Sequence, residues 1–381
     1  MPLQSIKSST FFILHISPME SSKLFFSFFY CCFLLSSGYI CIQASPLNHH
    51  HRRQKHEISD GSLRPKKLFV FGDSYADTGN IRKSLGNSWN EPYGSTFPGK
   101  PAGRFSDGRI LTDYIAKFLE VKSPLAYEWM EMGGKKLRNG LNFAYGGSGV
   151  FNTIGDLLPN MSTQIGFYDK LVHDSVYTKS DLKSSLVLVC LSGNDYGAFL
   201  AEGGTMQGLQ TFIPRVVNQL GVNLKRLQQL GATKVAVTLL QPLGCLPRST
   251  VDTTFRRCNT TQNLAVSYHN LLLQQIVAKL NNQSKSSTFF IIDLYSSFTT
   301  VLNEKRDYLG NLRFDTPLKP CCVGTDGYVC GSVDEKGAKM YTVCSDPKSA
   351  FFWDLAHPTE AGWHAIYTTF KSTLEQAFKF Y

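Results

Sequence analysis

Residues 67–80 read KLFVFGDSYADTGN, and in this stretch a short apolar run gives way abruptly to small and polar residues. The apolar run at 68–71 is followed directly by Gly72, Asp73 and Ser74. A short apolar run that ends at turn residues predicts a buried strand of a parallel sheet. Open α/β sheets bind their ligands outside the carboxyl ends of such strands. The stretch therefore predicts Ser74 at the ligand-binding edge of a sheet, as a candidate nucleophile.

The chain beyond residue 66 continues with alternating strand and helix patterns. Three further apolar runs predict strands, at residues 185–191, 234–240 and 288–294. Helical spacing of apolar residues occurs at 110–119, 212–230, 265–280 and 358–378. Strands separated by helices of this length predict a parallel sheet with right-handed crossovers. Because no internal repeat or linker interrupts this part, we predict one α/β domain, 66–381, with three α/β/α layers around a mainly parallel central sheet.

The N-terminal segment has the pattern of a targeting sequence. Lys23 precedes a mostly apolar stretch at 24–42, and small residues follow it. This order predicts a secretory signal that is cleaved after Ala44. A membrane anchor is the alternative, but the apolar core is short and is interrupted by serines. We therefore predict a signal peptide over 1–44, a disordered basic linker over 45–65, and a secreted protein with no stable membrane insertion.

The cysteines fit a secreted protein. Of the ten cysteines, seven lie beyond the predicted signal peptide, and Cys190 among them is within an apolar run, which favours a buried free thiol. In a secreted chain the other six predict up to three disulfides without fixing their pairing. These six are Cys245, Cys258, Cys321, Cys322, Cys330 and Cys344. Because none has CxxC spacing, we predict no structural zinc.

Charge and sequons narrow the class of protein further. The net charge is +10, but the sequence lacks the interleaved basic and aromatic pattern of a nucleic-acid binder, so no nucleic-acid partner is predicted. The histidine run at 49–51 favours a flexible tract over a metal site. Asn160, Asn259 and Asn282 each begin an N-x-S/T sequon, which fits passage through the secretory pathway.

A nucleophilic serine needs a base, a group that orients the base, and donors for the oxyanion. The predicted domain contains His173, His269, His357 and His364. Of these, His357 follows Asp354 by three residues just before a predicted helix, so one loop can present the imidazole and the carboxylate together. The other three histidines are better explained as helix-surface or core residues.

Three turns provide candidate oxyanion donors. They are the backbone N–H of Ser74, a backbone N–H within Gly146-Gly147, and the side-chain amide of Asn194 after a predicted strand. Each glycine has an alternative role in the turn alone, and Asn194 has an alternative role as a helix cap.

Four blocks in this order resemble the plant GDSL esterase/lipase family, also called SGNH hydrolases. The blocks are Gly-Asp-Ser at 72–74, NFAYGG at 142–147, Gly-Asn-Asp at 193–195 and Asp-x-x-His at 354–357. The resemblance extends over about residues 66–375 and implies an SGNH-hydrolase-like, flavodoxin-like sheet. The sequence contains no G-x-S-x-G, which counts against an ordinary α/β-hydrolase nucleophile elbow.

The resemblance implies a role for each candidate residue. Ser74 is the expected nucleophile and an oxyanion donor, with Gly146 and Asn194 as the other donors. His357 is the expected base, and Asp354 is the acid that orients it.

Two positions in these blocks need comment. We prefer Gly146 to Gly147 because it directly follows Asn-Phe-Ala-Tyr. Tyr75 stands where the family name has leucine, which affects no catalytic atom and bears only on local packing.

The predicted function is a secreted serine carboxylic ester hydrolase of the apoplast or cell wall. It would act through an acyl-serine on small-molecule or lipid esters, with no metal or organic cofactor. One alternative is an acyltransferase that uses an acceptor alcohol in place of water. Another is a catalytically silent defence or binding protein, which is disfavoured because every expected catalytic group is present. We expect substrate choice to depend on loops at 81–106 and 151–180, and the sequence predicts neither the acyl chain nor the oligomeric state.

Overall fold

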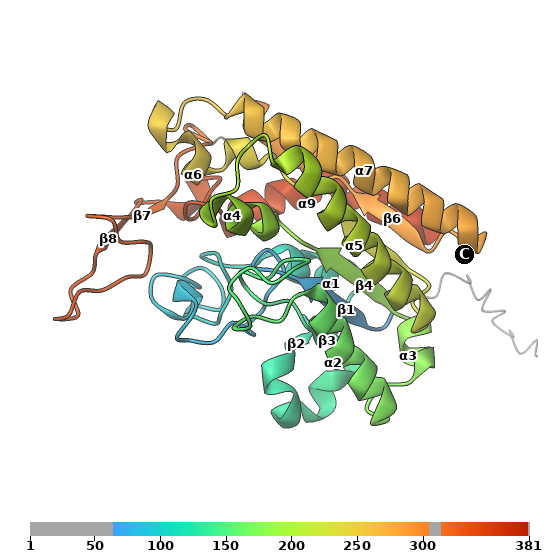
Figure 1. Ribbon diagram of the computed structural model, residues 1–381. Coiled ribbons are helices and arrows are strands. Elements are labelled where there is room, and N and C mark those ends of the chain that lie inside the picture. The colour runs from blue at the N-terminus through green and yellow to red at the C-terminus, as the bar shows by residue number, and fades with distance from the viewer. Residues whose placement is uncertain (1–63, 305–313, 380–381) are drawn as a thin grey trace, which may run out of the picture. The chain divides into compact units, whose positions relative to one another are not determined.

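The strand predicted ahead of Ser74 lies in the middle of the sheet. In the computed structural model, which describes residues 64–304 and 314–379, β1 (Figure 1) spans Leu68–Gly72. All of its residues are buried. β1 pairs in parallel, along its full length, with β4 (Leu186–Cys190). Because the two strands end together, the loops that follow them meet at one edge of the sheet.

The central sheet has six strands, all parallel, in the order β2-β3-β1-β4-β5-β6. The remaining strands are β2 (Leu125–Ala126), β3 (Leu141–Asn142), β5 (Val235–Thr238) and β6 (Phe289–Ile292). Without the two-residue edge strand β2, the order counted along the chain is 2-1-3-4-5, the flavodoxin-like arrangement. The predicted single-domain α/β/α fold with a mainly parallel sheet is confirmed.

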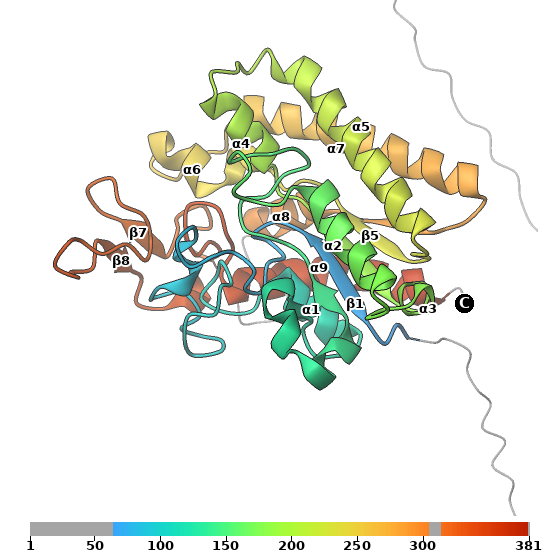
Figure 2. The ribbon, with the colours of Figure 1, turned by 60° about the horizontal axis from the view of Figure 1, so that its bottom comes forward.

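Side chains of β1 alternate between two hydrophobic cores, one on each face of the sheet. Phe69 and Phe71 pack in one core with α2, α5 and α7, whereas Leu68 and Val70 pack in the other with α1, α8 and α9. The first three helices span Met161–His173, Leu209–Gln229 and Thr260–Ser284, and the last three span Leu111–Phe118, Leu294–Asn303 and Glu360–Lys379. α5 and α7 run side by side in both ribbon views (Figure 1, Figure 2). Each large apolar side chain buried here contributes about 1.5–3 kcal/mol, so the two cores hold the three layers together.

The chain reverses its direction across the sheet at β1. From β1 it passes through α1 to the edge strand β2 and then to β3 on one side, and it returns through α2 and α3 (Lys179–Lys183) to β4 on the other. Only glycine fits at the end of β1, because Gly72 has a φ of 152° and a Cβ there would lie 1.9 Å from the carbonyl oxygen of Cys190. The reversal therefore brings two strand ends into close contact where open sheets bind their ligands.

Three local expectations differ from the structure. The segment 151–180, expected to be a loop, contains α2, whose N-cap is the side chain of Asn160. The segment 315–350, in which no strand was predicted, contains an antiparallel hairpin of β7 (Cys322–Gly324) and β8 (Tyr341–Val343). The last helix begins at Glu360, after Pro358.

Short helices complete the described elements. Two α-helices are α4 (Asn194–Ala201) and α6 (Pro247–Thr250). The 3₁₀ helices span Asn87–Trp89, Tyr127–Met132, Gly134–Asn139, Leu243–Cys245, Val251–Thr253 and Pro347–Ser349.

The cysteine prediction is confirmed and the pairing is now defined. The disulfides join Cys245 to Cys258, Cys321 to Cys344, and Cys322 to Cys330. Cys190 is a buried free thiol.

The described residues all belong to one compact unit, Asp60–Tyr381. The predicted signal peptide and nearly all of the predicted linker lie outside the described residues. Within 64–304 and 314–379, no helix is both long and apolar enough to cross a membrane.

Candidate active site

Ser74 lies in the turn that ends β1. The backbone N–H of Asp73 donates to the carbonyl of Cys190, and the N–H groups of Ala76 and Asp77 donate to the carbonyl of Asp73. These bonds fix the turn between β1 and the following segment. Ser74 is 7% exposed, and its side chain lines a pocket of about 220 Å³.

The structure brings the predicted base and acid to this serine. His357 Nε2 lies 2.8 Å from Ser74 Oγ, and His357 Nδ1 lies 2.8 and 2.9 Å from the two carboxylate oxygens of Asp354. The N–H of Trp353 donates to the carbonyl of His357 at 2.7 Å, which closes the loop that carries both residues. Serine, imidazole and carboxylate therefore form one continuous hydrogen-bonded chain.

Asp354 is held as a carboxylate by its surroundings. Burial alone would raise its pKa, but the nearby His357 and the hydrogen bonds outweigh burial and hold the pKa below its ordinary value. Its Oδ1 accepts from the backbone N–H groups of Ala356 and His357, and its Oδ2 accepts from the Tyr93 hydroxyl at 2.8 Å. An ionised Asp354 with these fixed donors favours the imidazole tautomer that carries its proton on Nδ1, which leaves Nε2 free to accept from Ser74.

Aromatic packing fixes the imidazole from the side. The Phe105 ring stacks on the His357 ring, with centroids 4.9 Å apart and an interplanar angle of 29°. Phe105 in turn touches Gly146, where a Cβ would lie 2.4 Å from the ring. The loop at 81–106 therefore reaches the site through Phe105 as well as through Tyr93.

The two glycines differ in whether their backbone N–H is available. The Gly146 N–H donates to Asp77 at 2.9 Å. Among the described residues, the N–H groups of Gly147 and Ser74 donate to no acceptor, and both residues line the pocket. Of the two glycines, Gly147 is therefore the one whose N–H is without an acceptor in the described part of the chain, and the predicted role of Gly146 as a donor would require it to release Asp77.

Asn194 also lines the pocket, but its amide is engaged. Its Nδ2 donates to Asp73 at 3.0 Å and to the carbonyl of Ser148 at 2.9 Å. Both partners are acceptors, which fixes the orientation of the amide. To donate to an oxyanion, Asn194 has to release or share one of these two bonds.

Two buried aspartates of the 67–80 stretch shape this region without lining the pocket. Asp73 also accepts from the Ser192 backbone N–H and hydroxyl, and Asp77 accepts from the backbone N–H groups of residues 79–81. Burial raises the pKa of each carboxyl to about 6, while the hydrogen bonds act in the opposite direction. Asp73 thus joins the end of β1 to the loop after β4.

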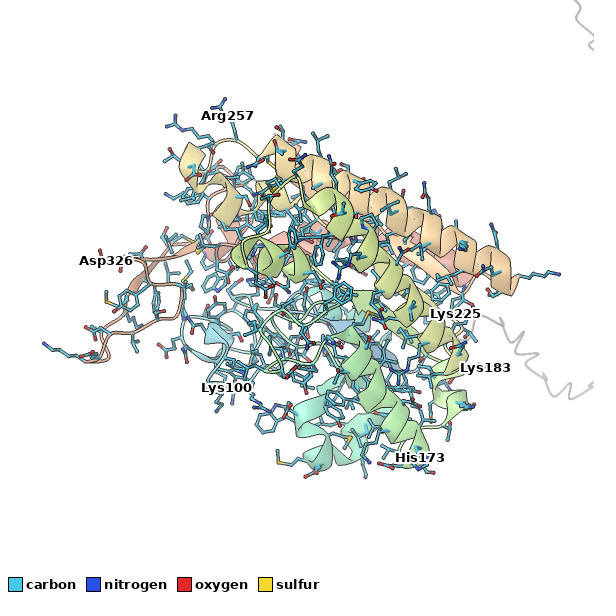
Figure 3. All side chains as sticks on the ribbon, viewed as in Figure 1. Lys100, His173, Lys183, Lys225, Arg257 and Asp326 are labelled. Atoms are coloured by element: carbon cyan, nitrogen blue, oxygen red, sulfur yellow. A yellow bond between two sulfur atoms is a disulfide. The ribbon has the colours of Figure 1, made fainter. Side chains whose placement is uncertain are left out.

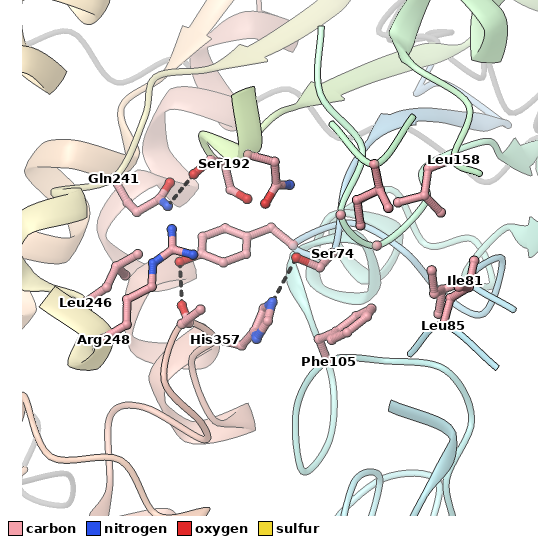
Figure 4. A pocket seen from close by; sticks show the side chains of 16 residues that line it. Ser74, Ile81, Leu85, Phe105, Leu158, Ser192, Gln241, Leu246, Arg248 and His357 are labelled. Carbon is pink, nitrogen blue, oxygen red and sulfur yellow. Dashed lines mark hydrogen bonds between the residues drawn. The ribbon is translucent and has the colours of Figure 1, made fainter. Parts of the chain in front are cut away.

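The pocket has two unlike walls on either side of Ser74 (Figure 4). One wall is apolar and consists mainly of Ile81, Leu85, Ile154 and Leu158. The other wall carries polar groups from Ser192, Gln241 and Arg248, with the apolar side chain of Leu246 beside Arg248 (Figure 4).

The remaining histidines take no part in this arrangement. His269 is buried beside the Tyr196 hydroxyl, and burial lowers its pKa to about 3. His364 lies in α9, where its ring is near Tyr114. Within the described ranges, no group of three or more His, Cys, Asp or Glu side chains is placed to hold a metal ion.

Sequence reasoning missed several residues that support the site. They are Asp77, Tyr93, Phe105, Gln164 and Arg248. Gln164 of α2 forms two 2.9 Å hydrogen bonds with the backbone of Gly72. The apolar positions 161, 165 and 168 carried the signal for α2, and Asn160 before them carried the signal for its cap. No sequence signal marks Tyr93 as a partner of Asp354, because the two are 261 residues apart.

Comparison with known proteins identifies the family. The model of the GDSL-like lipase/acylhydrolase family matches residues 68–369. The chain belongs to this family. The predicted class of enzyme, a carboxylic ester hydrolase, is confirmed by this membership.

Two relatives from Arabidopsis thaliana are similar over most of the chain. GDSL esterase/lipase At5g03610 is 53% identical, over 92% of this chain and 97% of the relative. GDSL esterase/lipase At3g09930 is 48% identical, over 94% of this chain and 99% of the relative. Among solved structures, the acetylxylan esterase Axe2 of Geobacillus stearothermophilus is 13% identical, over 83% of this chain and 95% of that one, with a TM-score of 0.35, which is too low to support a conclusion here.

Proposed function

We propose that this GDSL-family protein hydrolyses carboxylic esters through an acyl-Ser74 intermediate. The observation that carries the proposal is the chain from Asp354 through His357 to Ser74 Oγ, with 2.8 Å at each link, beside two backbone N–H groups that have no acceptor among the described residues. No contact of the described residues favours the alternative acyltransferase, which would use the same groups.

In the first half of the reaction, Ser74 Oγ attacks the carbonyl carbon of the ester while His357 Nε2 takes the hydroxyl proton. The negative charge that develops on the carbonyl oxygen is stabilised by hydrogen bonds from the N–H groups of Ser74 and Gly147. Asn194 adds a third hydrogen bond when its amide releases one of its present acceptors. The C–O bond to the alcohol then breaks, and His357 returns the proton to the leaving oxygen. The products of this half are the free alcohol and acyl-Ser74.

In the second half, water replaces the alcohol. His357 takes a proton from the water as its oxygen attacks the acyl carbon, and the proton passes to Ser74 Oγ as the acyl–oxygen bond breaks. The products are a carboxylic acid and free Ser74. Asp354 keeps the ring oriented and stabilises the imidazolium in both halves.

The apolar wall at Ile81, Leu85, Ile154 and Leu158 supports an apolar acyl group, from a lipid or another acyl ester. Secretion is part of the proposal and is supported by the three disulfides, which are typical of oxidising compartments. The signal peptide over 1–44 and the linker over 45–65 belong to the same proposal.

The test is hydrolysis of p-nitrophenyl butyrate by the purified protein with its disulfides intact. Ser74→Ala and His357→Ala should each lower kcat/KM by about 10³ to 10⁶, with the melting transition retained. A fluorophosphonate probe should label Ser74 in the wild type, and mass spectrometry of the labelled peptide identifies the modified residue. Activity that persists in Ser74→Ala, or labelling at another residue, contradicts the proposal.

A further inference from the structure

The polar wall of the pocket contains a charge that the proposed hydrolysis does not use. Of the described residues that line the pocket, only Arg248 carries a permanent charge. Its guanidinium points into the pocket from the wall opposite Ile81, Leu85 and Leu158 (Figure 4). The site is therefore electrostatically asymmetric about Ser74.

The Arg248 side chain has no carboxylate partner among the described residues. It belongs to the short helix α6 and is exposed at the pocket. Its backbone N–H donates to the carbonyl of Leu355 at 2.9 Å, which ties this position to the loop that carries His357. Burial raises the pKa of the neighbouring Tyr75 hydroxyl well above its ordinary value, and the Arg248 charge acts against that rise. Arg248 is thus anchored by its backbone, while its guanidinium has no carboxylate partner in the described part of the chain.

Gln241 makes the same wall polar. Gln241 is 1% exposed, its Nε2 donates to the carbonyl of Ser192 at 2.9 Å, and its Oε1 accepts no hydrogen bond from the described residues. An unsatisfied buried acceptor beside a free guanidinium is a poor surface for an alkyl chain, because burying both against hydrocarbon costs free energy. This wall fits a polar part of the substrate.

The chemistry decides which part of the ester faces which wall. Gly147, the favoured backbone donor to the oxyanion, is close to the apolar wall, since a Cβ there would lie 2.9 Å from Leu158 and 3.8 Å from Ile154. An apolar acyl chain would fit against this wall, because burying hydrocarbon there removes apolar surface from water. The alcohol leaves towards His357, which returns its proton, and the loop of His357 is bonded to Arg248.

We propose that Arg248 is a specificity-determining residue that selects esters whose alcohol part carries an anionic group, a carboxylate or a phosphate. The inference rests on the proposed function, because it assigns the alcohol side of the same site. A guanidinium forms paired, charge-assisted hydrogen bonds with such groups. The contact lies away from the reacting atoms and is made before and during the reaction, so it lowers KM for the anionic ester more than it raises kcat.

The test compares two esters that differ only in charge. They are the butyryl esters of 3-hydroxybenzoate and of 3-hydroxybenzamide. Each kcat/KM is divided by the rate constant for hydrolysis of the same ester by hydroxide, which corrects for intrinsic reactivity. We expect the wild type to prefer the anionic ester about tenfold, mostly through KM, and Arg248→Gln to abolish this preference. Arg248→Lys should keep part of it, and added salt should weaken it. A butyryl ester of 3-hydroxyphenyl phosphate, run in parallel, shows whether phosphate or carboxylate is preferred.

Arg257→Gln is the matched control, since Arg257 is exposed and points away from the rest of the molecule (Figure 3). This variant removes the same charge and should keep the full preference. The inference is overturned if the wild type has the same normalised kcat/KM for both esters. It is also overturned if Arg248→Gln keeps the wild-type preference for the anionic ester. The same comparison can be made without turnover, by measuring the Kd of the two esters for Ser74→Ala and for the double variant Ser74→Ala/Arg248→Gln. A difference in Kd that depends on Arg248 supports this inference even if the hydrolysis proposal fails, so the two failures are distinguishable.

Discussion

Replacing Asp354 with asparagine tests the hydrogen-bonded chain at the site directly. In the wild type, Oδ1 of Asp354 accepts the backbone N–H groups of Ala356 and His357, and Oδ2 accepts the Tyr93 hydroxyl. The amide oxygen of the introduced asparagine would keep the place of Oδ1, because two backbone donors point at it. Its NH₂ group would then replace Oδ2 and face His357 Nδ1.

This change should reverse the tautomer of the imidazole. Nδ1 facing an NH₂ group has to accept a hydrogen bond, so the ring proton moves to Nε2, where it faces Ser74 Oγ. Nε2 then has no lone pair to take the serine proton. In a comparable triad this substitution lowers kcat by about 10⁴, and here we expect about 10³ to 10⁴ in kcat/KM, about 4–5.5 kcal/mol in the barrier. The loss should be smaller than that of Ser74→Ala or His357→Ala, because Asp354 does not itself react.

The assay is hydrolysis of p-nitrophenyl butyrate, accompanied by thermal melting to establish that the variant is folded. Asp326→Asn is the control, since Asp326 is exposed between β7 and β8, and it should keep full activity. A loss of less than tenfold in Asp354→Asn would refute the reasoning. It would mean that the productive tautomer is held without Oδ2. The contact of Oδ1 with Nδ1 at 2.8 Å and the stacking of Phe105 on the ring would then be sufficient.

Three further perturbations test how the site and the fold are supported. Tyr93→Phe removes the hydroxyl that donates to Asp354, so the free energy of unfolding should fall by about 1.5–3 kcal/mol in urea titration, with a smaller loss of kcat/KM than in Asp354→Asn. Asp113→Asn breaks a buried bidentate pair with Arg104, with both N–O distances 2.8 Å, and should cost about 3–5 kcal/mol at neutral pH. Burial alone would raise the pKa of Asp113, but the Arg104 charge and the hydrogen bonds to the carboxylate together outweigh burial and lower the pKa. This stability is therefore present above pH about 4 and is lost as the pH falls through the lowered value, so the difference between variant and wild type should shrink in acid. Cys330→Ser opens the shortest disulfide loop and should lower the free energy of unfolding by about 2–3 kcal/mol, and an unchanged urea midpoint would contradict this.

The sequence was sufficient for the parts of the fold that depend on local pattern. Apolar runs such as 68–71 and 185–191 are short, uninterrupted and bounded by turn residues, so they predict buried strands with little ambiguity. Strands β2 and β3 have only two residues each, and their pairing depends on register with β1. Two residues carry no periodicity, so neither strand was predictable.

The candidate site divides in the same way. Asp354 and His357 are three residues apart on one loop, so their pairing was readable from their spacing. The hydrogen bond that engages the N–H of Gly146 could not be predicted from spacing, because its acceptor, Asp77, lies 69 residues earlier in the chain. The choice between Gly146 and Gly147 depends on this contact, and a sequence block records only that two glycines are adjacent.

Asp73 and Asp77 explain why the stretch at 67–80 requires more than a serine. Neither carboxylate lines the pocket, yet each is buried, and each accepts a hydrogen bond from a group that the sequence predicted as an oxyanion donor, Gly146 for Asp77 and Asn194 for Asp73. Asp77 occupies the N–H of Gly146, so of the two glycines Gly147 is the one whose N–H has no acceptor in the described part of the chain, and Asp73 holds the amide of Asn194 at the same edge. Burial raises the pKa of both carboxyls to about 6, so keeping them charged near neutral pH is a cost that the folded protein bears. The two aspartates would offset that cost by setting which donors face the ester. A side chain that could not accept these hydrogen bonds would leave the same N–H groups free to point at the ester.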